Sequence, residues 1–223
     1  RSAWVGAQQY PIHWGGDTRS TFKGFKQSVR GGLSLLASGF QFWSCDIGGY
    51  KPKPSETLYI RWAQWALLSL SHPRFHGKTP REPWMFGDKA SEIVIEFAKL
   101  RYRLLPYYLS YGCEAAATGV PIMRPMALEF EDYEQASTSA TQHMVGEEFL
   151  VAPVLSADGQ VRVDLPPGEW VDYWSGEYHT GSECQTLDLD LDELPFFVRA
   201  ESIIPEDPSA SMHTDGPPEE LRY

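Results

Sequence analysis

Two short apolar runs in the first fifty residues predict β-strands. The first covers residues 3–12 and leads into the loop 14–17. The second lies in residues 39–50, where Phe40, Phe42 and Ser44 alternate with Gln41, Trp43 and Cys45. A period of two is typical of a strand whose two faces meet different surroundings. A Gly-Gly pair comes after each run, so we expect a turn at both places.

Three helices are predicted by apolar residues that recur every three or four positions. The third begins near Ser91, is interrupted at Pro106 and resumes to about Thr118, where Gly119 is a suitable stop. The apolar positions that define the three helices are Phe22, Phe25, Val29 and Leu33, then Leu58, Trp62, Trp65 and Leu68, then Ile93, Phe97, Leu100 and Leu104.

Strand and helix alternate at intervals of roughly 30 residues, which indicates βα units joined by right-handed crossovers. Asp17 and Asp46 each follow a predicted strand. In a (β/α)₈ barrel, residues in these positions meet at the face that carries the active site. About three units are visible and eight are needed, so the barrel cannot close from this chain alone.

The pattern changes near residue 120. Short alternating or apolar runs separated by Gly, Pro and Asp follow, and this spacing predicts a small all-β sandwich. These runs are residues 121–130, 148–155, 161–165, 168–174 and 194–199. We therefore expect the barrel part in residues 1–120, the sandwich in 121–205 and an acidic, Pro-rich solvated tail in 206–223.

Composition limits the class of partner. The formal net charge is −11, and we expect neither nucleic acid nor an anionic membrane surface to bind. The sequence shows no signal peptide and no apolar run long enough to span a bilayer. The chain lacks an initiating Met and starts within a predicted strand, so we expect it to be a piece of a longer protein.

Cysteine usage excludes two further classes of site. The three cysteines, Cys45, Cys113 and Cys184, form no pairing pattern and no metal-ligand spacing. This gives a slight preference for a reducing compartment such as the cytoplasm. Cys45 lies beside Asp46 and is either a buried apolar residue or a reactive thiol. We expect no metal and no cofactor.

Residues 13–17, His-Trp-Gly-Gly-Asp, hold the most informative chemistry. Trp14 offers a flat apolar face to a sugar ring, while Gly15 and Gly16 let a ligand approach the backbone. Asp17 would then be placed to protonate a leaving-group oxygen. The alternative is structural: a strand, a Gly-Gly turn and an Asp that caps the following helix.

The segment RSAWVGAQQYPIHWGGD resembles glycoside hydrolase family 31, the α-glucosidases and α-xylosidases. Further segments match in the same order: GGLSLLASGFQFWSCDIGGY, SHPRFHG, PIMRPMALEF and LVAPV. The resemblance covers roughly residues 1–205. It implies the C-terminal portion of a (β/α)₈ TIM barrel followed by a small sandwich domain, with Asp17 as general acid/base.

The same resemblance implies roles for five other residues. Arg1 and His76 would contact sugar hydroxyls, Trp14 and Trp43 would line the pocket, and Asp46 would shape it. A surface Arg, a core Trp and a helix-capping Asp remain the alternatives for Arg1, for the two tryptophans and for Asp46. The family's nucleophile lies upstream of this segment, so we expect it in the missing N-terminal part of the parent chain.

The expected parent protein is a retaining α-glycosidase that removes terminal α-linked xylosyl residues from oligosaccharides. The alternatives are an α-glucosidase of the same family, or a non-catalytic carbohydrate-binding or structural module that uses Trp170 and Trp174. These two residues lie four apart and would share one face of a strand. We expect the isolated chain to be inactive, and poorly soluble or oligomeric because strand edges are uncovered.

Overall fold

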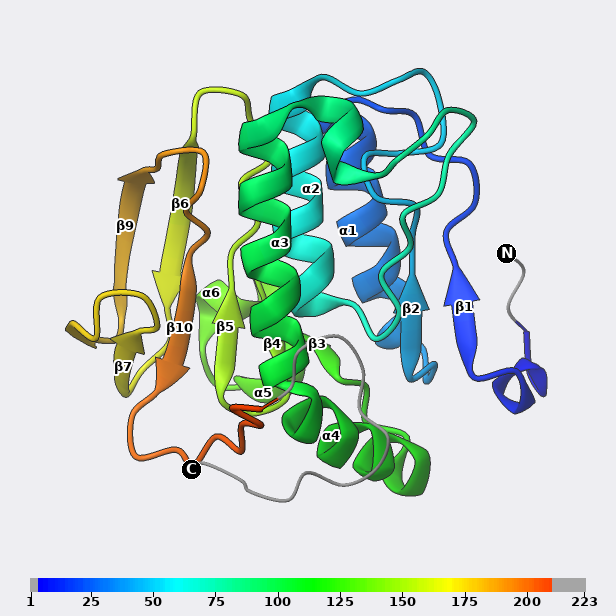
Figure 1. Ribbon diagram of the computed structural model, residues 1–223. Helices are drawn as coiled ribbons and strands as arrows, with labels where there is room; N and C mark the ends of the chain where they lie inside the picture. Colours follow the sequence, from blue (N-terminus) through cyan, green and yellow to red (C-terminus); the bar gives the residue numbers. More distant parts are fainter. Residues whose placement is uncertain (1–3, 210–223) are drawn as a thin grey trace.

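The computed structural model describes residues 4–209 (Figure 1). Its first half contains two strands and four α-helices, and its second half consists mainly of strands. The elements of the first half are η1 (Ala7–Gln9), β1 (Ile12–Trp14), α1 (Phe22–Leu36), β2 (Phe42–Ser44), α2 (Glu56–Ser69), η2 (Pro83–Phe86), α3 (Asp88–Arg103) and α4 (Leu105–Thr118). Those of the second half are β3 (Met123–Pro125), α5 (Met126–Glu129), α6 (Glu134–Thr138), β4 (His143–Val145), β5 (Phe149–Val151), β6 (Gln160–Leu165), β7 (Glu169–Asp172), β8 (Tyr178–Thr180), β9 (Glu183–Asp188) and β10 (Phe196–Arg199).

The three predicted helices are present. Thr21 caps α1 by accepting a hydrogen bond from Gly24 N at 3.0 Å, and Ser55 caps α2 through Leu58 N at 3.3 Å. The third helix divides into α3 and α4 near Pro106, which has no N–H to continue the helical hydrogen bonds. Gly119 ends α4 with a left-handed φ of 85°, as the sequence predicts.

The first strand is shorter and later than residues 3–12. Residues 4–10 instead form tight turns, in which Ala7 N donates to Trp4 O and Tyr10 N donates to Ala7 O, both at 2.9 Å. Pro11 has no N–H to offer a neighbouring strand, so β1 begins after it, at Ile12. The predicted limits of this strand were therefore wrong, and strand β2 covers only the centre of its predicted segment.

β1 and β2 form a two-stranded parallel sheet in which Ile12 pairs with Phe42 and Trp14 with Ser44. Helices α1 and α2 follow them, so residues 4–209 contain two regular βα units rather than about three. The next segment forms no further strand beside β2 but contacts it through hydrogen bonds from Ser71 Oγ to Trp43 O at 3.0 Å and from Ser44 Oγ to His72 O at 2.7 Å. An isolated parallel bridge between Asp46 and Arg74 follows. Ile12 is 45% exposed, which leaves apolar surface at the β1 side of this sheet.

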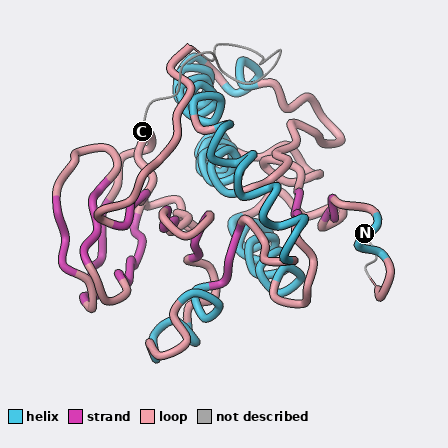
Figure 2. The backbone as a smooth tube through the Cα atoms, turned by 90° about the horizontal axis from the view of Figure 1, so that it is seen from below, coloured by secondary structure: helices cyan, strands magenta, loops and turns pink. Residues whose placement is uncertain are grey.

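The second half contains a six-stranded sheet in the order β3-β4-β5-β10-β7-β8 and a separate pair, β6-β9. All of these pairings are antiparallel. The segment after Pro125 turns helical as α5, although it was predicted to continue a strand. In Figure 2, helices separate most strands of the second half of the chain from the strands that lie nearest the N-terminus.

Strands β4 and β5 of the six-stranded sheet are buried along their whole length, whereas the edge strand β8 is partly exposed. Phe149, Val151 and Phe196 belong to the large core shared with helices α1–α4, whereas Leu150 and Phe197 belong to a second cluster with residues of β6. Neighbouring residues of a strand point to opposite faces, so β5 and β10 supply both cores. The sheet is consequently a middle layer between the helices and the β6-β9 pair (Figure 1).

Residues 206–209 differ from the expected solvated tail. Asp207 is buried, and its N–H donates to Arg103 O at 2.8 Å. Glu206 accepts from Arg103 Nη2 at 2.6 Å and from Tyr173 Oη at 3.0 Å. Because the Glu206 carboxylate is bound by Arg103 and Tyr173, it replaces contacts with bulk water by contacts within the protein, and this part of the predicted tail packs onto α3. Residues 210–223 lie outside the described residues.

Candidate active site at the strand ends

The carboxyl ends of β1 and β2 bring two predicted site segments to one edge of the sheet. The strands are parallel neighbours, and the loops that contain Asp17 and Asp46 follow them directly. A parallel bridge between Arg19 and Lys51 continues the pairing beyond the strands. Asp17 and Asp46 therefore emerge from the same edge, as expected for residues at the carboxyl ends of barrel strands.

Asp46 is the centre of a polar cluster. Its side chain is fully buried, and Oδ1 lies 3.3 Å from His76 Nδ1 and 3.8 Å from Arg74 Nε. The Arg74 guanidinium lies 5.3 Å from the centre of the Trp14 ring. Burial raises the pKa of the Asp46 carboxyl, while Arg74 and then His76 oppose that rise. The structure thus brings Trp14, Asp46 and His76 together.

Arg74 was not among the candidate residues chosen from the sequence. It lies two positions before His76, and extended backbone places such residues on the same side. Ile47 N donates to Arg74 O at 2.9 Å, which fixes this segment beside the Asp46 loop. The spacing within Arg74-Phe-His76 was the signal that would have added Arg74 to the cluster.

Asp17 lies in a different part of the same edge. It is exposed and lines a cavity of about 340 Å³ together with residues of the β1 loop and helix α1. The helix N-cap is Thr21, so the interpretation of Asp17 as the cap of this helix is wrong. Gly16 has a φ of 85°, which fits the predicted need for glycine in this turn.

Trp43 is a core residue whose ring also reaches the Asp17 cavity. It is only 7% exposed, yet it lines that cavity. A Cβ atom at Gly15 would lie 2.8 Å from Trp43 Cζ2, and one at Gly32 would lie 2.6 Å from Nε1. The indole is therefore held between the β1 loop and α1. Gly15 makes room for this side chain and also lines the Asp17 cavity.

Two further predictions concern Arg1 and Cys45. Arg1 lies outside the described residues. Cys45 is completely buried and accepts from Trp62 Nε1 at 3.4 Å. Burial raises the pKa of its thiol to about 11, so the reactive thiolate is disfavoured. The structure favours the interpretation of Cys45 as a buried packing residue.

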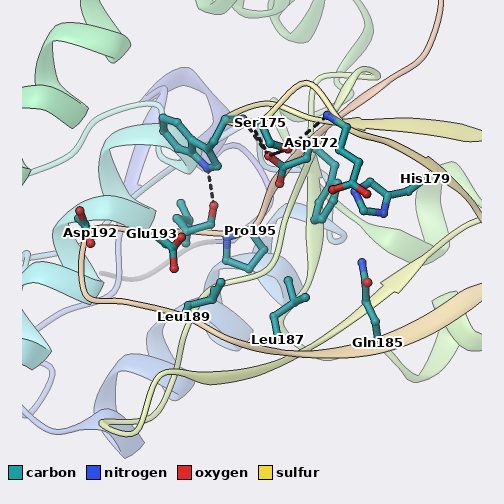
Figure 3. Close-up of a pocket in the computed structure, with 13 residues that line it drawn as sticks. Asp172, Ser175, His179, Gln185, Leu187, Leu189, Asp192, Glu193 and Pro195 are labelled. Atoms are coloured by element: carbon teal, nitrogen blue, oxygen red, sulfur yellow. Dashed lines mark hydrogen bonds between the residues drawn. The ribbon is translucent and has the colours of Figure 1, made fainter.

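The predicted pair Trp170 and Trp174 does not share a face. Trp170 is 1% exposed in the second core cluster, while Trp174 is 46% exposed and contacts Phe97 of α3. Strand β7 ends at Asp172, so the chain turns between the two tryptophans. Trp174 borders a pocket of about 430 Å³ that is also lined by His179 and Gln185 (Figure 3). Its Nε1 donates to Leu194 O at 2.7 Å.

In the described part of the chain, no group of three or more His, Cys, Asp or Glu side chains is arranged to hold a metal ion. None of the helices among residues 4–209 is long and apolar enough to cross a bilayer.

Two family models match the chain. The model described as the glycosyl hydrolases family 31 TIM-barrel domain matches residues 1–111, and the family 31 C-terminal domain matches residues 119–204. An α-xylosidase of Emericella nidulans is 40% identical over 92% of this chain and 27% of its own length. An α-glucosidase of Bacillus thermoamyloliquefaciens is 34% identical over 92% of this chain and 26% of its own length.

The architecture is also similar to that of a solved enzyme. The cycloalternan-forming enzyme of Listeria monocytogenes, in complex with a pentasaccharide substrate, superposes with a TM-score of 0.89 and 34% identity. That match covers 93% of this chain and 21% of the enzyme. The chain therefore spans about a quarter of the length of the relatives that it matches.

Proposed function

Because the chain belongs to glycoside hydrolase family 31, we propose that it is part of a retaining α-glycosidase that removes terminal α-linked xylosyl residues from oligosaccharides. The observation that carries the proposal is the emergence of Asp17 and Asp46 from one edge of the β1-β2 sheet. The relatives that span several times the length of this chain support a longer parent protein.

In the proposed reaction, Asp17 is the general acid/base. A carboxylate from the part of the parent preceding Arg1 attacks the anomeric carbon while the glycosidic C–O bond breaks. Asp17 gives its proton to the departing oxygen. Water then attacks the anomeric carbon, Asp17 takes up the water proton, and the carboxylate of the nucleophile is released.

The other candidate residues bind the sugar. Trp14 supplies an apolar ring face, and His76 and Arg74 offer donors to hydroxyl groups beside the buried Asp46. Trp43 forms a wall of the Asp17 cavity, and Arg1 supplies a further donor. Asp46 holds Arg74 and His76 in place, which fits its burial.

We also propose that residues 1–120 complete a (β/α)₈ barrel with the preceding part of the parent. In this division, residues 121–205 form a small β-sandwich from the six-stranded sheet and the β6-β9 pair. The shared cluster between these two sheets supports this division.

The experiment that tests the function is hydrolysis by the longer protein. Matched p-nitrophenyl α-xyloside and α-glucoside should both be substrates, with the xyloside giving the higher kcat/KM. Proton NMR of the first product should show the α-anomer, since two displacements retain configuration. A higher kcat/KM for the glucoside would favour an α-glucosidase. A β-anomer as first product, or no hydrolysis of either substrate, would contradict the proposal.

The non-catalytic alternative rests on the pocket beside Trp174 (Figure 3). Aromatic rings beside polar groups suit sugars, and Gln185 and His179 also line this pocket. Binding of xylosyl or glucosyl oligosaccharides by this chain, lost in Trp174→Ala and retained in Asp17→Asn, would favour a binding module.

A further inference from the structure

Arg81 is a buried arginine in the loop that leads from His76 to η2. Its side chain is 2% exposed. Nε donates to Gly49 O at 3.2 Å, and Nη2 donates to the carbonyl oxygens of Gly49, Tyr50 and Pro52 at 2.9, 3.1 and 3.3 Å. Nη1 donates to Thr79 O at 2.9 Å and also to the Thr79 hydroxyl. In the described structure, each of these acceptors is a neutral oxygen.

Residues 49–52, to which Arg81 donates, belong to the middle one of three neighbouring loops. The three loops contain Asp17, Asp46 and His76. Tyr50 N donates to Thr18 O at 2.8 Å and Ser20 N donates to Lys51 O at 3.0 Å, so this segment holds the Asp17 loop. On its other side, Lys78 N donates to Tyr50 O at 2.8 Å and joins the His76 loop. A shift of residues 49–52 would therefore move both neighbouring loops.

The packing around Arg81 leaves little freedom. Tyr59 of α2 donates from its hydroxyl to Arg81 O at 2.6 Å, which anchors the backbone to the core. A Cβ atom at Gly77 would lie 2.6 Å from Arg81 Cζ. Burial of a guanidinium is unfavourable, and the attraction of the nearby Asp46 carboxylate offsets this cost for Arg81 only in part. An apolar side chain would fill such a site at less cost. What arginine adds is a rigid fork of five donors that fixes several carbonyls at once.

We propose that Arg81 is a positioning residue, which sets the distance and angle between the Asp46 loop and the loops that carry Asp17 and His76. This inference rests on the proposed function and adds a residue that acts through the backbone. Arg81 does not touch the reacting atoms. Its effect on the reaction comes from holding the acid and the sugar-binding groups in register, where a misplacement of 1 Å can cost about 10²-fold in rate.

The first test is hydrogen exchange in the longer protein that contains this chain. In Arg81→Met, amides of residues 47–51 and 76–79 should exchange about tenfold faster or more, because their hydrogen-bonded anchor is gone. Arg61→Met is the matched control. Arg61 is also 2% exposed and donates only to backbone carbonyls, Glu193 O at 2.6 Å and Leu189 O at 2.9 Å. Unchanged exchange in Arg81→Met, or equal acceleration in Arg61→Met, overturns the inference.

The second test keeps the positive charge at position 81 and disturbs its hydrogen bonds. Gly77→Ala introduces the Cβ that collides with Arg81, and Arg81→Lys retains the charge without the fork. Per folded active site, both variants should lose about 10²-fold in kcat/KM, mainly through kcat, because misplaced groups weaken binding of the transition state most. Arg61→Lys should keep kcat and KM.

Wild-type kcat and KM in Gly77→Ala and Arg81→Lys, or an equal loss in Arg61→Lys, contradicts the positioning role. The failure of the proposed function would look different. The wild-type protein would then hydrolyse neither glycoside, while the exchange experiment would still report whether Arg81 holds the three loops.

Discussion

Two regions of the molecule contain similar polar residues but differ in how far these residues are buried. One is the group of loops at the strand ends. The other, called the seam below, is the contact of α2 with His143 and residues 189–193. At the seam, Arg61 and Gln64 donate to backbone carbonyls of residues 189–193, and His143 Nε2 lies 2.9 Å from Ser69 Oγ. All four of these side chains are buried. At the strand ends, the Arg74 and His76 side chains are 33% and 50% exposed although both contact Asp46.

This difference separates polar groups that hold the fold from polar groups that are available to a ligand. At the seam, burial removes water, and Arg61 Nη1, Arg61 Nη2 and Gln64 Nε2 each donate to a backbone carbonyl, which joins the two layers. Arg61 Nε has no partner among the described residues. At the strand ends, one buried carboxylate orients two partly exposed side chains, Arg74 and His76. In the proposed function, sugar hydroxyl groups bind to these two side chains.

The largest expected effect is at Asp17. In the longer protein, Asp17→Asn should lower kcat on xylosyl disaccharides by about 10²–10⁴-fold, because a sugar leaving group needs protonation. The measurement is the steady-state rate with natural disaccharides. Asp132→Asn is the control, since Asp132 is an exposed carboxylate of the C-terminal half. An equal loss in both variants would contradict a specific role for Asp17.

A large loss of stability is expected where the sheet meets the helices. Phe149 is 1% exposed and contacts Phe196 and Tyr107, with ring centres 4.5 and 4.8 Å apart. Phe149→Ala should lower the free energy of unfolding by about 3–5 kcal/mol, measured with urea. Leu109→Ala on exposed α4 should change it by about 0.5 kcal/mol or less. Similar losses of the free energy of unfolding in the two variants would show that the sheet and the helices do not share a core at Phe149.

The seam should also make stability depend on pH. Burial lowers the pKa of His143 to about 4, so its folded form stays neutral while the unfolded form takes up a proton below about 6.5. Stability from this residue is therefore present above pH 6.5 and is lost as the pH falls towards 4, at most by about 1.4 kcal/mol per unit. In His143→Gln, the free energy of unfolding measured with urea should lack this part of the dependence on pH. An unchanged slope would indicate that His143 is not buried neutral.

The smallest effect is expected at Asp46. Burial raises the pKa of Asp46 in the folded protein. Its contribution to the free energy of unfolding is therefore fully present below the ordinary carboxyl pKa of about 3.9 and declines as the pH rises through the pKa of the folded protein. Asp46→Asn removes this decline and keeps an acceptor for His76. The stability of the variant relative to the wild type should therefore increase with pH above about 4. A relative stability that falls over this range would contradict a raised pKa.

The sequence predicted the helices well because a period of 3.6 and a terminal Gly119 are local signals. The capping residues Thr21 and Ser55 were not predicted, although their residue types are typical of caps. Strand limits were less predictable. The turns at residues 4–10 carry as many apolar side chains as a strand would, and the end of β7 at Asp172 gave no sign that would separate Trp170 from Trp174.

The candidate site was only partly predictable for the same reason. The Gly-Gly pairs and the strand spacing located Asp17 and Asp46, but no local pattern distinguishes an exposed carboxylate from a buried one. The role of Arg81 could not be predicted from the sequence, because its main acceptors are carbonyl groups of residues 49–52, which are distant from Arg81 in the sequence. Backbone acceptors have no residue type, so long-range contacts of this kind appear only in the folded structure.

The most direct test of the central claim, that Asp17 is the acid/base, is the product formed with azide. In Asp17→Asn of the longer protein, an aryl or fluoride α-xyloside should still form the covalent intermediate, because its leaving group needs little protonation. Azide needs no general base, so it should restore turnover and yield α-xylosyl azide, in which two displacements retain the configuration. Formation of the β-azide, or no rescue together with equal losses for good and poor leaving groups, would contradict the account.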